Sequence, residues 1–570
     1  MEARKIKGTE ALLLSLLGEG TDTIFGYPGG TIMPFYDNIY DYSDKINHIL
    51  VRHEQGAVHA AEGYARSTGK VGVCVATSGP GATNFITGIA DAMMDSTPIV
   101  CITAQVNVEK LGTDFFQEAD MIGITIPITK WSYLITKAAE IPETVAKAFH
   151  IAQSGKPGPV VLSLTKNAQV ELMEFGEYKR EEYVKTVHKP LEDLNFEKVH
   201  KAAELLNNAQ RPLIIAGHGV TISKAEEELK NLAEIGNIPV ANTLMGISCI
   251  STEHPLYIGK VGMHGNIAPN AMTQQADVIL AVGMRFSDRV TGEVEGYAPN
   301  AQIIHIDIDE TEINKNVQVE LPIVGNAKDV LAEIIPYIKY SERSEWFKYE
   351  EELAAQEYEM IIRPKLQSEK EEIFMGQVVD CVSNKANHSA IIVTDVGQNQ
   401  MFSARYAKFR KNRSWVTSGG LGTMGFGLPA AIGAKMGNKD REVIAILGDG
   451  GFQMNIQELG TIMQSKIGVK IVLLNNTFLG MVRQWQELFF NKKYAFTQLD
   501  NPDFQEIAKA YRIPSARVTK HSDLEAAVEK MLKTDGAYFL EVAVLKEENV
   551  FPMIPAGCTL NDIIYDKPNK

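Results

Sequence analysis

An apolar run that ends in a glycine-flanked acid occurs at Val443-Ile444-Ala445-Ile446-Leu447-Gly448-Asp449-Gly450. A second apolar run, residues 469–474, is followed by Asn475-Asn476. Each run has the length and composition of a buried parallel strand, and the chain between Gly450 and the second run is long enough for a helix. The polar residues therefore lie where strands end, the edge at which open α/β sheets bind ligands.

The polar groups at this edge suit a metal-bound phosphate. An Asp carboxylate, an Asn side-chain oxygen and a nearby backbone carbonyl are the hard ligands that Mg²⁺ takes. Gly450 and Gly451 allow the backbone to approach a diphosphate, and a helix beginning near Asn455 would direct its amide dipoles at it. An Asp-Gly turn alone is common, but the paired spacing on two strand ends favours a magnesium and diphosphate site.

Units of strand, glycine turn and helix recur on both sides of this motif. Apolar runs at 71–76 and 99–103, for example, enclose a glycine turn at 78–84. Such alternation predicts the α/β class, with three doubly wound parallel-sheet domains. We place them at residues 1–183, 195–340 and 373–570. Between them, the charged stretch 171–194 is predicted to be a linker and 341–372 a solvated helical connector.

Composition narrows the function classes. A chain of 570 residues with 45% hydrophobic residues can bury several cores. Its net charge of −15, from 56 basic and 71 acidic residues, argues against a nucleic-acid partner or an anionic membrane. The five cysteines are scattered without metal-ligand spacing, and no signal segment or long apolar run is present. We therefore expect a cytoplasmic protein with free thiols.

Many motifs follow one another in one order along nearly the whole chain. They lie at 25–30, 52–66, 78–84, 112–120, 262–265, 285–292, 417–427, the diphosphate motif and 480–485. Together they resemble the catalytic large subunits of acetohydroxyacid (acetolactate) synthases, a family of thiamine diphosphate enzymes. The resemblance implies three domains, which bind the pyrimidine ring of thiamine diphosphate, FAD, and the diphosphate with Mg²⁺, respectively.

The family's activity and assembly are further implications of the resemblance. Its members condense two 2-oxoacids, pyruvate with pyruvate or with 2-oxobutyrate, with decarboxylation, on the route to valine, leucine and isoleucine. They form a homodimer or homotetramer with the active site at the subunit interface, and a small regulatory subunit is an expected partner.

The resemblance also carries residue roles to this sequence. Glu54 would hydrogen-bond the aminopyrimidine ring and promote the tautomer that deprotonates the thiazolium. Met424 would hold the cofactor folded, and Gln117 would line the reaction centre. The implied Mg²⁺ ligands are Asp449, the Asn476 side chain and the Phe478 carbonyl. The implied substrate contacts are Phe116, Lys166, Arg289 and Trp485.

The other implied contacts belong to the two organic cofactors. Those with thiamine diphosphate are Gly29, Gly30, Gly422, Gly448, Gly450, Gly451 and Met481. Those with FAD are Lys156, Gly217, Met263, His264, Gly283, Arg285 and Asp307. Three features depart from the family pattern: Lys156 stands where an Arg is usual, Ser287 replaces an Asp, and the tail at 556–560 lacks a Ser-Gly-Gly run. A Lys cannot reproduce the planar paired contacts of an Arg.

Other interpretations remain open at this stage. Glu54 is also an ordinary carboxylate for a helix start, Arg289 an ordinary surface cation, and Trp485 an ordinary core aromatic. A flavin-free catabolic acetolactate synthase or a pyruvate oxidase-like enzyme would share the diphosphate motif, although Trp485 and the 285–292 run argue against both. A non-catalytic assembly partner would be expected to have lost Glu54, Asp449 or Asn476, and all three are present.

Overall fold

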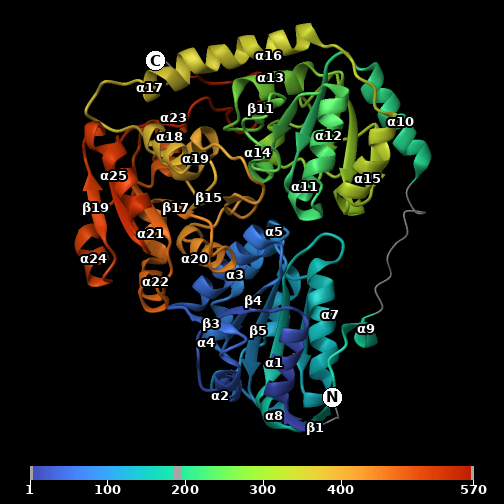
Figure 1. Ribbon diagram of the computed structural model, residues 1–570, viewed down its shortest axis with the longest axis vertical. Coiled ribbons are helices and arrows are strands. Elements are labelled where there is room, and N and C mark those ends of the chain that lie inside the picture. The colour runs from blue at the N-terminus through green and yellow to red at the C-terminus, as the bar shows by residue number, and fades with distance from the viewer. Residues whose placement is uncertain (1–3, 185–194, 566–570) are drawn as a thin grey trace.

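Three parallel sheets, each covered by helices, build the molecule (Figure 1). The computed structural model describes residues 4–184 and 195–565, so residues 185–194 of the predicted linker lie outside the described residues. In Figure 1 the N-terminal domain is at the bottom, the central domain at the upper right and the C-terminal domain at the left. Each sheet has six strands, and the α/β class with three doubly wound domains is confirmed. No helix within the described ranges is long and apolar enough to cross a bilayer.

The N-terminal domain has the strand order β3-β2-β4-β5-β7-β6. Its strands are β2 (Thr23–Gly26), β3 (Asn47–Leu50), β4 (Gly72–Ala76), β5 (Ile99–Gln105), β6 (Trp131–Ile135) and β7 (Val160–Thr165). Its main helices are α1 (Gly8–Gly18), α2 (Met33–Ile39), α3 (Glu54–Thr68), α5 (Ile86–Met94), α7 (Ile141–Gln153) and α8 (Lys166–Val170). A small antiparallel pair, β1 (Arg4–Lys7) and β8 (Leu172–Phe175), closes the domain. The predicted strands at 71–76 and 99–103 are thus present.

The central domain has the order β11-β10-β9-β12-β13-β14. Its strands are β9 (Pro212–Ala216), β10 (Val240–Asn242), β11 (Tyr257–Lys260), β12 (Val278–Val282), β13 (Gln302–Asp307) and β14 (Leu321–Val324). Its main helices are α10 (Phe196–Asn208), α11 (His218–Ser223), α12 (Glu226–Gly236), α13 (Ile267–Gln275) and α15 (Ala327–Ile334). Because the chain runs outward from β9 in one direction and from β12 in the other, the switch point for ligand binding lies between these two strands.

The C-terminal domain has the order β16-β15-β17-β18-β20-β19. Its strands are β15 (Ile391–Thr394), β16 (Trp415–Val416), β17 (Val443–Gly448), β18 (Lys470–Asn475), β19 (Ser515–Val518) and β20 (Tyr538–Ala543). Its main helices are α18 (Met375–Lys385), α19 (Gln398–Tyr406), α20 (Gly427–Gly437), α21 (Asp449–Met454), α22 (Leu459–Ser465), α23 (Gly480–Phe489), α24 (Phe504–Ala510) and α25 (His521–Lys533). The two runs of the diphosphate motif are the neighbouring parallel strands β17 and β18, as predicted.

A helical segment does begin near Asn455, since this residue is the N-cap of a short 3-10 helix, Ile456–Glu458, that leads into α22, but it is not the first helix after the motif. Helix α21 begins at Asp449, directly after Gly448 in extended conformation, and Asn455 ends it. The Asn455 side chain is used elsewhere, because its Nδ2 donates to the backbone oxygen of Gly425 at 2.7 Å. The first amide groups of the helix therefore lie closer to the diphosphate motif than we expected.

The connector between the central and C-terminal domains is helical but not wholly solvated. Helix α16 (Ser344–Glu357) crosses the top of both domains in Figure 1 and leads to α17 (Arg363–Leu366). Trp346 is buried and its indole N–H donates to the oxygen of Pro212 at 2.9 Å. Glu357 is also buried and forms an ion pair with Arg405 of α19. The prediction of a solvated face missed both contacts.

Two small-residue helices join the N-terminal and C-terminal domains. A Cβ added at Gly63 of α3 would lie 2.0 Å from the oxygen of Ala430, and one at Gly433 of α20 would lie 1.7 Å from the oxygen of Ala60. Neither position has room for a side chain, so these glycines allow the helices to touch through their backbones. Their alanines belong to one buried core shared by the two domains.

Candidate active site

The predicted metal ligands lie together at the carboxyl ends of β17 and β18. Asp449 is buried, and the Nδ2 of Asn501 donates to its Oδ2 at 2.7 Å and to Oδ1 of Asn475 at 3.1 Å. The Oδ1 of Asn476 accepts from the backbone N–H of Phe478 at 3.1 Å. These contacts hold the carboxylate of Asp449 and the side-chain amide oxygens of Asn475 and Asn476 at one sheet edge.

The chemistry of this edge fits a hard cation. Burial raises the pKa of Asp449 to about 6, and the groups that hydrogen-bond its carboxylate are neutral: Asn501 and backbone N–H groups that include that of Thr477. A buried carboxylate with only neutral partners is costly in the charged state. Mg²⁺ would supply the missing positive charge, and oxygen ligands are those it prefers.

The loop at 417–427 lies against this edge. A Cβ added at Gly450 would be 3.7 Å from the terminal methyl of Met424, so the predicted wedge residue adjoins the diphosphate turn. Gly422 and Gly425 have φ of 73° and 90°, values that favour glycine. The Asp395 carboxylate accepts from the N–H groups of Gly425 and Gly427.

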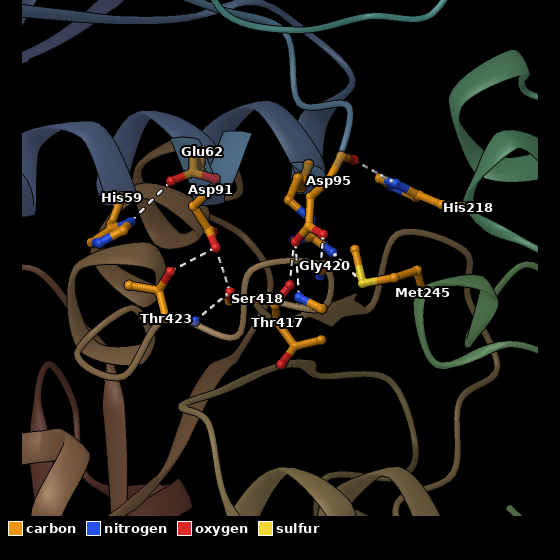
Figure 2. Close-up of polar contacts among 12 residues, drawn as sticks. His59, Glu62, Asp91, Asp95, His218, Met245, Thr417, Ser418, Gly420 and Thr423 are labelled. Carbon is orange, nitrogen blue, oxygen red and sulfur yellow. Dashed lines mark hydrogen bonds and ion pairs between the residues drawn. The ribbon is translucent and has the colours of Figure 1, made fainter. Parts of the chain in front are cut away.

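Carboxylates of the N-terminal domain hold the first part of the same loop (Figure 2). Asp95 accepts from the backbone N–H groups of Gly419 at 2.9 Å and Gly420 at 2.6 Å. Asp91 accepts from the hydroxyls of Ser418 and Thr423. Burial raises the pKa of Asp95 to about 6, and its strongest opposing neighbour is Arg66.

Asp95 also contacts the central domain. Its backbone oxygen lies 3.0 Å from the Nδ1 of His218, so the end of α5 touches all three domains. The position of the loop that carries Gly422 and Met424 is therefore set by a different domain from its own.

Glu54 lies at a second edge, formed by the N-terminal sheet. It is the first residue of α3, and its Oε2 accepts from Nδ2 of Asn84 at 2.9 Å. A Cβ added at Gly81 would be 3.2 Å from Oε1 of Glu54, so glycine leaves the carboxylate room. Asn84 fixes the orientation of the carboxylate from within the same domain.

Other predicted residues share this edge. Gly29 lies against Thr77, where a Cβ would fall 2.5 Å from the side chain, and Gly30 faces open space. Gln117, with φ of 61°, lies beside the Gly79 turn. Phe116 is 80% exposed, and Lys166 is an exposed residue at the start of α8.

A cavity of about 690 Å³ lies where the three domains meet. This volume is within the usual range of ligand sites. The predicted residues that line it are Lys156, Met263, His264, Gly283, Arg285, Asp307, Arg289, Gly422, Met481 and Trp485. Glu54, Gln117, Phe116 and Lys166 are not among its lining residues.

In the cavity wall formed by the central domain, two glycine turns pack closely against each other. Gly217 and Gly283 follow β9 and β12, and a Cβ at Gly217 would be 2.2 Å from the oxygen of Gly283. Gly283 has φ of 58°. The two turns therefore pack at the switch point of the sheet, where a dinucleotide places its phosphates.

Acidic residues mark one side of this switch point. Asp307 ends β13, and burial raises its pKa to about 6. The ammonium of Lys156, from the N-terminal domain, lies 2.7 Å from Oε1 of Glu312 and 3.4 Å from Oδ2 of Asp309. Lys156 is thus held at the rim by two carboxylates.

The 262–265 turn and the C-terminal tail form another part of the wall. The N–H of Met263 donates to the oxygen of Arg289 at 2.8 Å, and the N–H of Ile554 donates to the oxygen of Met263 at 2.8 Å. The N–H of Glu293 donates to the oxygen of Cys558. The atypical tail therefore closes onto the central domain.

Comparisons with known proteins match the whole arrangement. Residues 6–124, 199–334 and 395–542 match family models described as the N-terminal TPP binding domain, the central domain and the C-terminal TPP binding domain of thiamine pyrophosphate enzymes. A probable acetolactate synthase large subunit from Methanocaldococcus jannaschii is 44% identical over 98% of this chain and 95% of its own length.

Two bacterial relatives are also acetolactate synthase large subunits. The acetolactate synthase large subunit of Corynebacterium glutamicum is 42% identical over 98% of this chain and 90% of its own length. The isozyme 2 large subunit of Escherichia coli K12 is 41% identical over 98% of this chain and 99% of its own length. The chain belongs to the acetolactate synthase large-subunit family. It is therefore a thiamine diphosphate-dependent enzyme, as the resemblance implied.

In this acetolactate synthase family member, sequence reasoning missed residues that support the site. Asp395 follows β15 at the same sheet edge as Asp449, so the strand-end rule had the information to find it. Asn501 and Glu458 lie outside any recognised motif. Asp91 lies within α5, and Asp95 caps the C-terminal end of that helix. Only their contacts reveal them.

Proposed function

We propose that this protein condenses two molecules of pyruvate, or pyruvate with 2-oxobutyrate, and releases carbon dioxide. The product would be acetolactate or its 2-oxobutyrate-derived homologue, on the route to branched-chain amino acids. The proposal is carried by one observation: Glu54 and the Asp449 set lie at the carboxyl ends of two parallel sheets in a chain of the acetolactate synthase family. Bound thiamine diphosphate supplies the carbanion chemistry.

The predicted residues of the thiamine diphosphate site would have three separate roles. Glu54, oriented by Asn84, would exchange a proton with the aminopyrimidine ring. Asp449, Asn476 and the carbonyl of Phe478 would hold Mg²⁺ on the diphosphate, together with Gly448, Gly450 and Gly451. Met424 would keep the two rings of the cofactor close, which is a positioning role.

The roles of the predicted substrate contacts also follow from the family resemblance. Arg289 would pair with an incoming carboxylate by parallel hydrogen bonds. Trp485 and Met481 lie on one side of α23 and line the cavity, where the indole would contact the alkyl group of the second oxoacid. Gln117, Phe116 and Lys166 would complete the site from a different subunit.

We infer a homodimer or homotetramer with two-chain active sites. Exposed aromatic side chains support it: Phe116 is 80% exposed beside Gln117, and Phe496, after α23, is 100% exposed. Phe115, next to Phe116, is 50% exposed, and neighbouring exposed aromatic side chains of this kind mark interaction sites. A small regulatory subunit would be a further partner, and the five free cysteines suit the cytoplasm.

FAD would occupy the central cavity without net redox chemistry. The paired glycine turns, Asp307 and the His264 turn offer contacts for phosphates, ribose and ring, respectively. Lys156 would contribute less than an Arg, because its ammonium is already paired with Glu312 and Asp309.

One absorbance spectrum and one assay test the proposal. The purified protein is expected to show flavin absorption and to form acetolactate from pyruvate with Mg²⁺ and thiamine diphosphate, without an electron acceptor. A colourless protein that is fully active without FAD would identify the flavin-free catabolic alternative. A requirement for an electron acceptor would identify the oxidase-like one.

A further inference from the structure

Lys260 is a buried lysine with no role in the predicted site. It is the last residue of β11, lines the interdomain cavity and is 3% exposed. Within the part of the chain that the structure describes, its Nζ has no hydrogen-bond partner. A buried ammonium without a partner is costly, so a group that satisfies it would be strongly favoured.

The charges around Lys260 do not neutralise it. Glu357 of α16 is already fully engaged, since it accepts from Arg405, from Nδ2 of Asn266 and from the N–H of Ile267. Arg405 of α19 also donates to the oxygens of His264 and Gly265. The Arg405–Glu357 pair therefore holds the 262–267 turn in place, and among residues 4–184 and 195–565 Lys260 has no ion-pair partner.

Its other charged and titratable neighbours strengthen this conclusion. Burial, together with the nearby Arg405, lowers the pKa of Lys260 to about 7, and Glu357 opposes the shift. Burial, with Lys260, Arg405 and Arg289, lowers the pKa of His264 to about 3. In the described part of the chain the Nδ1 of that ring also has no hydrogen-bond partner. The segment 260–264 of the cavity wall thus carries two polar groups, the Nζ of Lys260 and the Nδ1 of His264.

The order of the strands says which end of a dinucleotide would meet Lys260. The glycine turns lie at the β9/β12 switch point, and Asp307 ends β13 on one side of it. Lys260 ends β11, on the opposite side. If the phosphates lie at the switch point and the acidic Asp307 takes a ribose hydroxyl, the second half of the ligand extends toward Lys260.

The C-terminal domain reaches the Lys260 segment through α19, whose Arg405 donates to the oxygens of His264 and Gly265. Gln400 and Met401 of the same helix line the cavity. The Lys260 side is therefore the one closest to the domain that carries the diphosphate motif. The flavin ring, rather than the adenine, is the group that fits there.

We propose that Lys260 is a positioning residue that places a positive charge beside the isoalloxazine ring of FAD and favours its reduced, anionic form. This inference rests on the proposed occupation of the cavity by FAD. Two-electron reduction adds two electrons and one proton, which leaves one negative charge on the ring. A buried cation beside the ring stabilises that charge more than it stabilises neutral, oxidised flavin.

The test is a reductive titration of FAD-loaded protein with xanthine, xanthine oxidase and a reference dye. Lys260→Met removes the charge while keeping the length of the side chain, and Lys260→Arg keeps the charge. We expect the Met variant to bind reduced FAD at least tenfold more weakly relative to oxidised FAD, which lowers the two-electron potential by about 30 mV per tenfold. Lys260→Arg should stay near the wild-type potential.

A matched control separates charge from the cost of changing a buried lysine. Lys470 is 2% exposed, but its ammonium is satisfied by the oxygens of Thr534 and Gly536, in the C-terminal domain. Lys470→Met should lower stability and leave the flavin potential unchanged. If Lys260→Met holds FAD with the wild-type potential, the inference about Lys260 is wrong but the proposed FAD site stands. If the wild-type protein binds no FAD, both the inference and the proposed FAD site are wrong.

A second measurement decides the question if Lys260→Met does not fold. The two-electron potential of the wild type, measured from pH 7 to pH 9, should fall more steeply with pH than that of Lys260→Arg, because Lys260 takes up a proton when the flavin becomes anionic. Lys260→Arg keeps its charge over this range and should show only the slope set by the proton that the flavin itself takes up. Equal slopes for the two proteins overturn the inference.

Discussion

The Oε1 atom of Glu458 accepts a hydrogen bond from the backbone N–H of His53 at 3.0 Å, across 405 residues of sequence. The same carboxylate accepts from the N–H of Arg52 at 3.0 Å. Glu458 follows α21 of the diphosphate motif, and His53 is the N-cap of α3, which begins at Glu54. The junction of two domains therefore fixes the start of the helix that carries the predicted catalytic acid.

The first prediction concerns this junction. Glu458→Ala leaves two backbone N–H groups without their acceptor, and we expect the free energy of unfolding to fall by about 1–3 kcal/mol. The turnover number should fall as well, because Glu54 loses its fixed position. Urea denaturation and a pyruvate assay measure both, with the exposed Glu506→Ala as control. Equal stability in the two variants would contradict the role of Glu458.

The second prediction concerns proton transfer. Glu54→Gln keeps the size of the side chain and removes its ability to exchange a proton, so acetolactate formation should fall by roughly 10² or more. Binding of thiamine diphosphate should change little. Exchange of the C2 proton of the cofactor, followed by NMR, should slow by a similar factor. Turnover near that of the wild type would sink the assignment of Glu54.

The third prediction concerns the metal. Asp449→Ala removes the charged member of the proposed ligand set, so Mg²⁺ and thiamine diphosphate should be lost together. Calorimetry of the apoprotein measures both affinities. Asp503→Ala, which removes an N-cap at α24 in the same domain, is the control and should keep both. Unchanged cofactor binding in Asp449→Ala would place the metal elsewhere.

The fourth prediction concerns acid stability. Burial lowers the pKa of His59 to about 4, and its Nδ1 lies 2.9 Å from Oε1 of Glu62 (Figure 2). A lowered pKa in the folded state means that the neutral ring stabilises the fold above pH 6.5, and that this contribution is lost as pH falls from 6.5 toward 4. At pH 5 the loss should be about 2 kcal/mol.

His59→Gln isolates this effect, because an amide does not titrate. Its unfolding free energy should change less between pH 7 and pH 5 than that of the wild type, by about the amount above. His521→Gln, at the first position of α25, is the control and should follow the wild-type pH dependence. Parallel pH profiles for His59→Gln and wild type would show that His59 is not the titrating group.

The fifth prediction concerns the second substrate. Trp485 lines the cavity and packs against Phe489, with 5.1 Å between ring centroids. One methylene against an apolar surface is worth about 1–3 kcal/mol, so the wild type should prefer 2-oxobutyrate over pyruvate by roughly 10- to 200-fold. Trp485→Leu should remove most of that preference and leave acetolactate formation from pyruvate nearly unchanged. The product ratio with both oxoacids present decides it: equal ratios would make Trp485 a packing residue only.

The sequence was sufficient for features that depend on local pattern. The apolar runs before Asp449 and Asn476 predicted β17 and β18, and the small residues after Glu54 predicted α3, because burial of a strand or a helix face leaves a periodic trace in neighbouring residues. The order of motifs predicted three α/β domains of one enzyme family. Boundaries were less secure, as the helix expected near Asn455 shows.

Contacts between domains were decided by the tertiary structure alone. Nothing near Glu458 in the sequence indicates that it binds the backbone before Glu54, or that Asp95 holds the loop leading to Met424. In the sequence, Lys260 is an ordinary residue at the end of a strand. Only the structure shows that its charged neighbours are Arg405 and a Glu357 that is already paired with Arg405. A hydrogen bond acts over a few ångströms in space and leaves no period along the chain, so partners hundreds of residues apart become visible only once packing has brought them together.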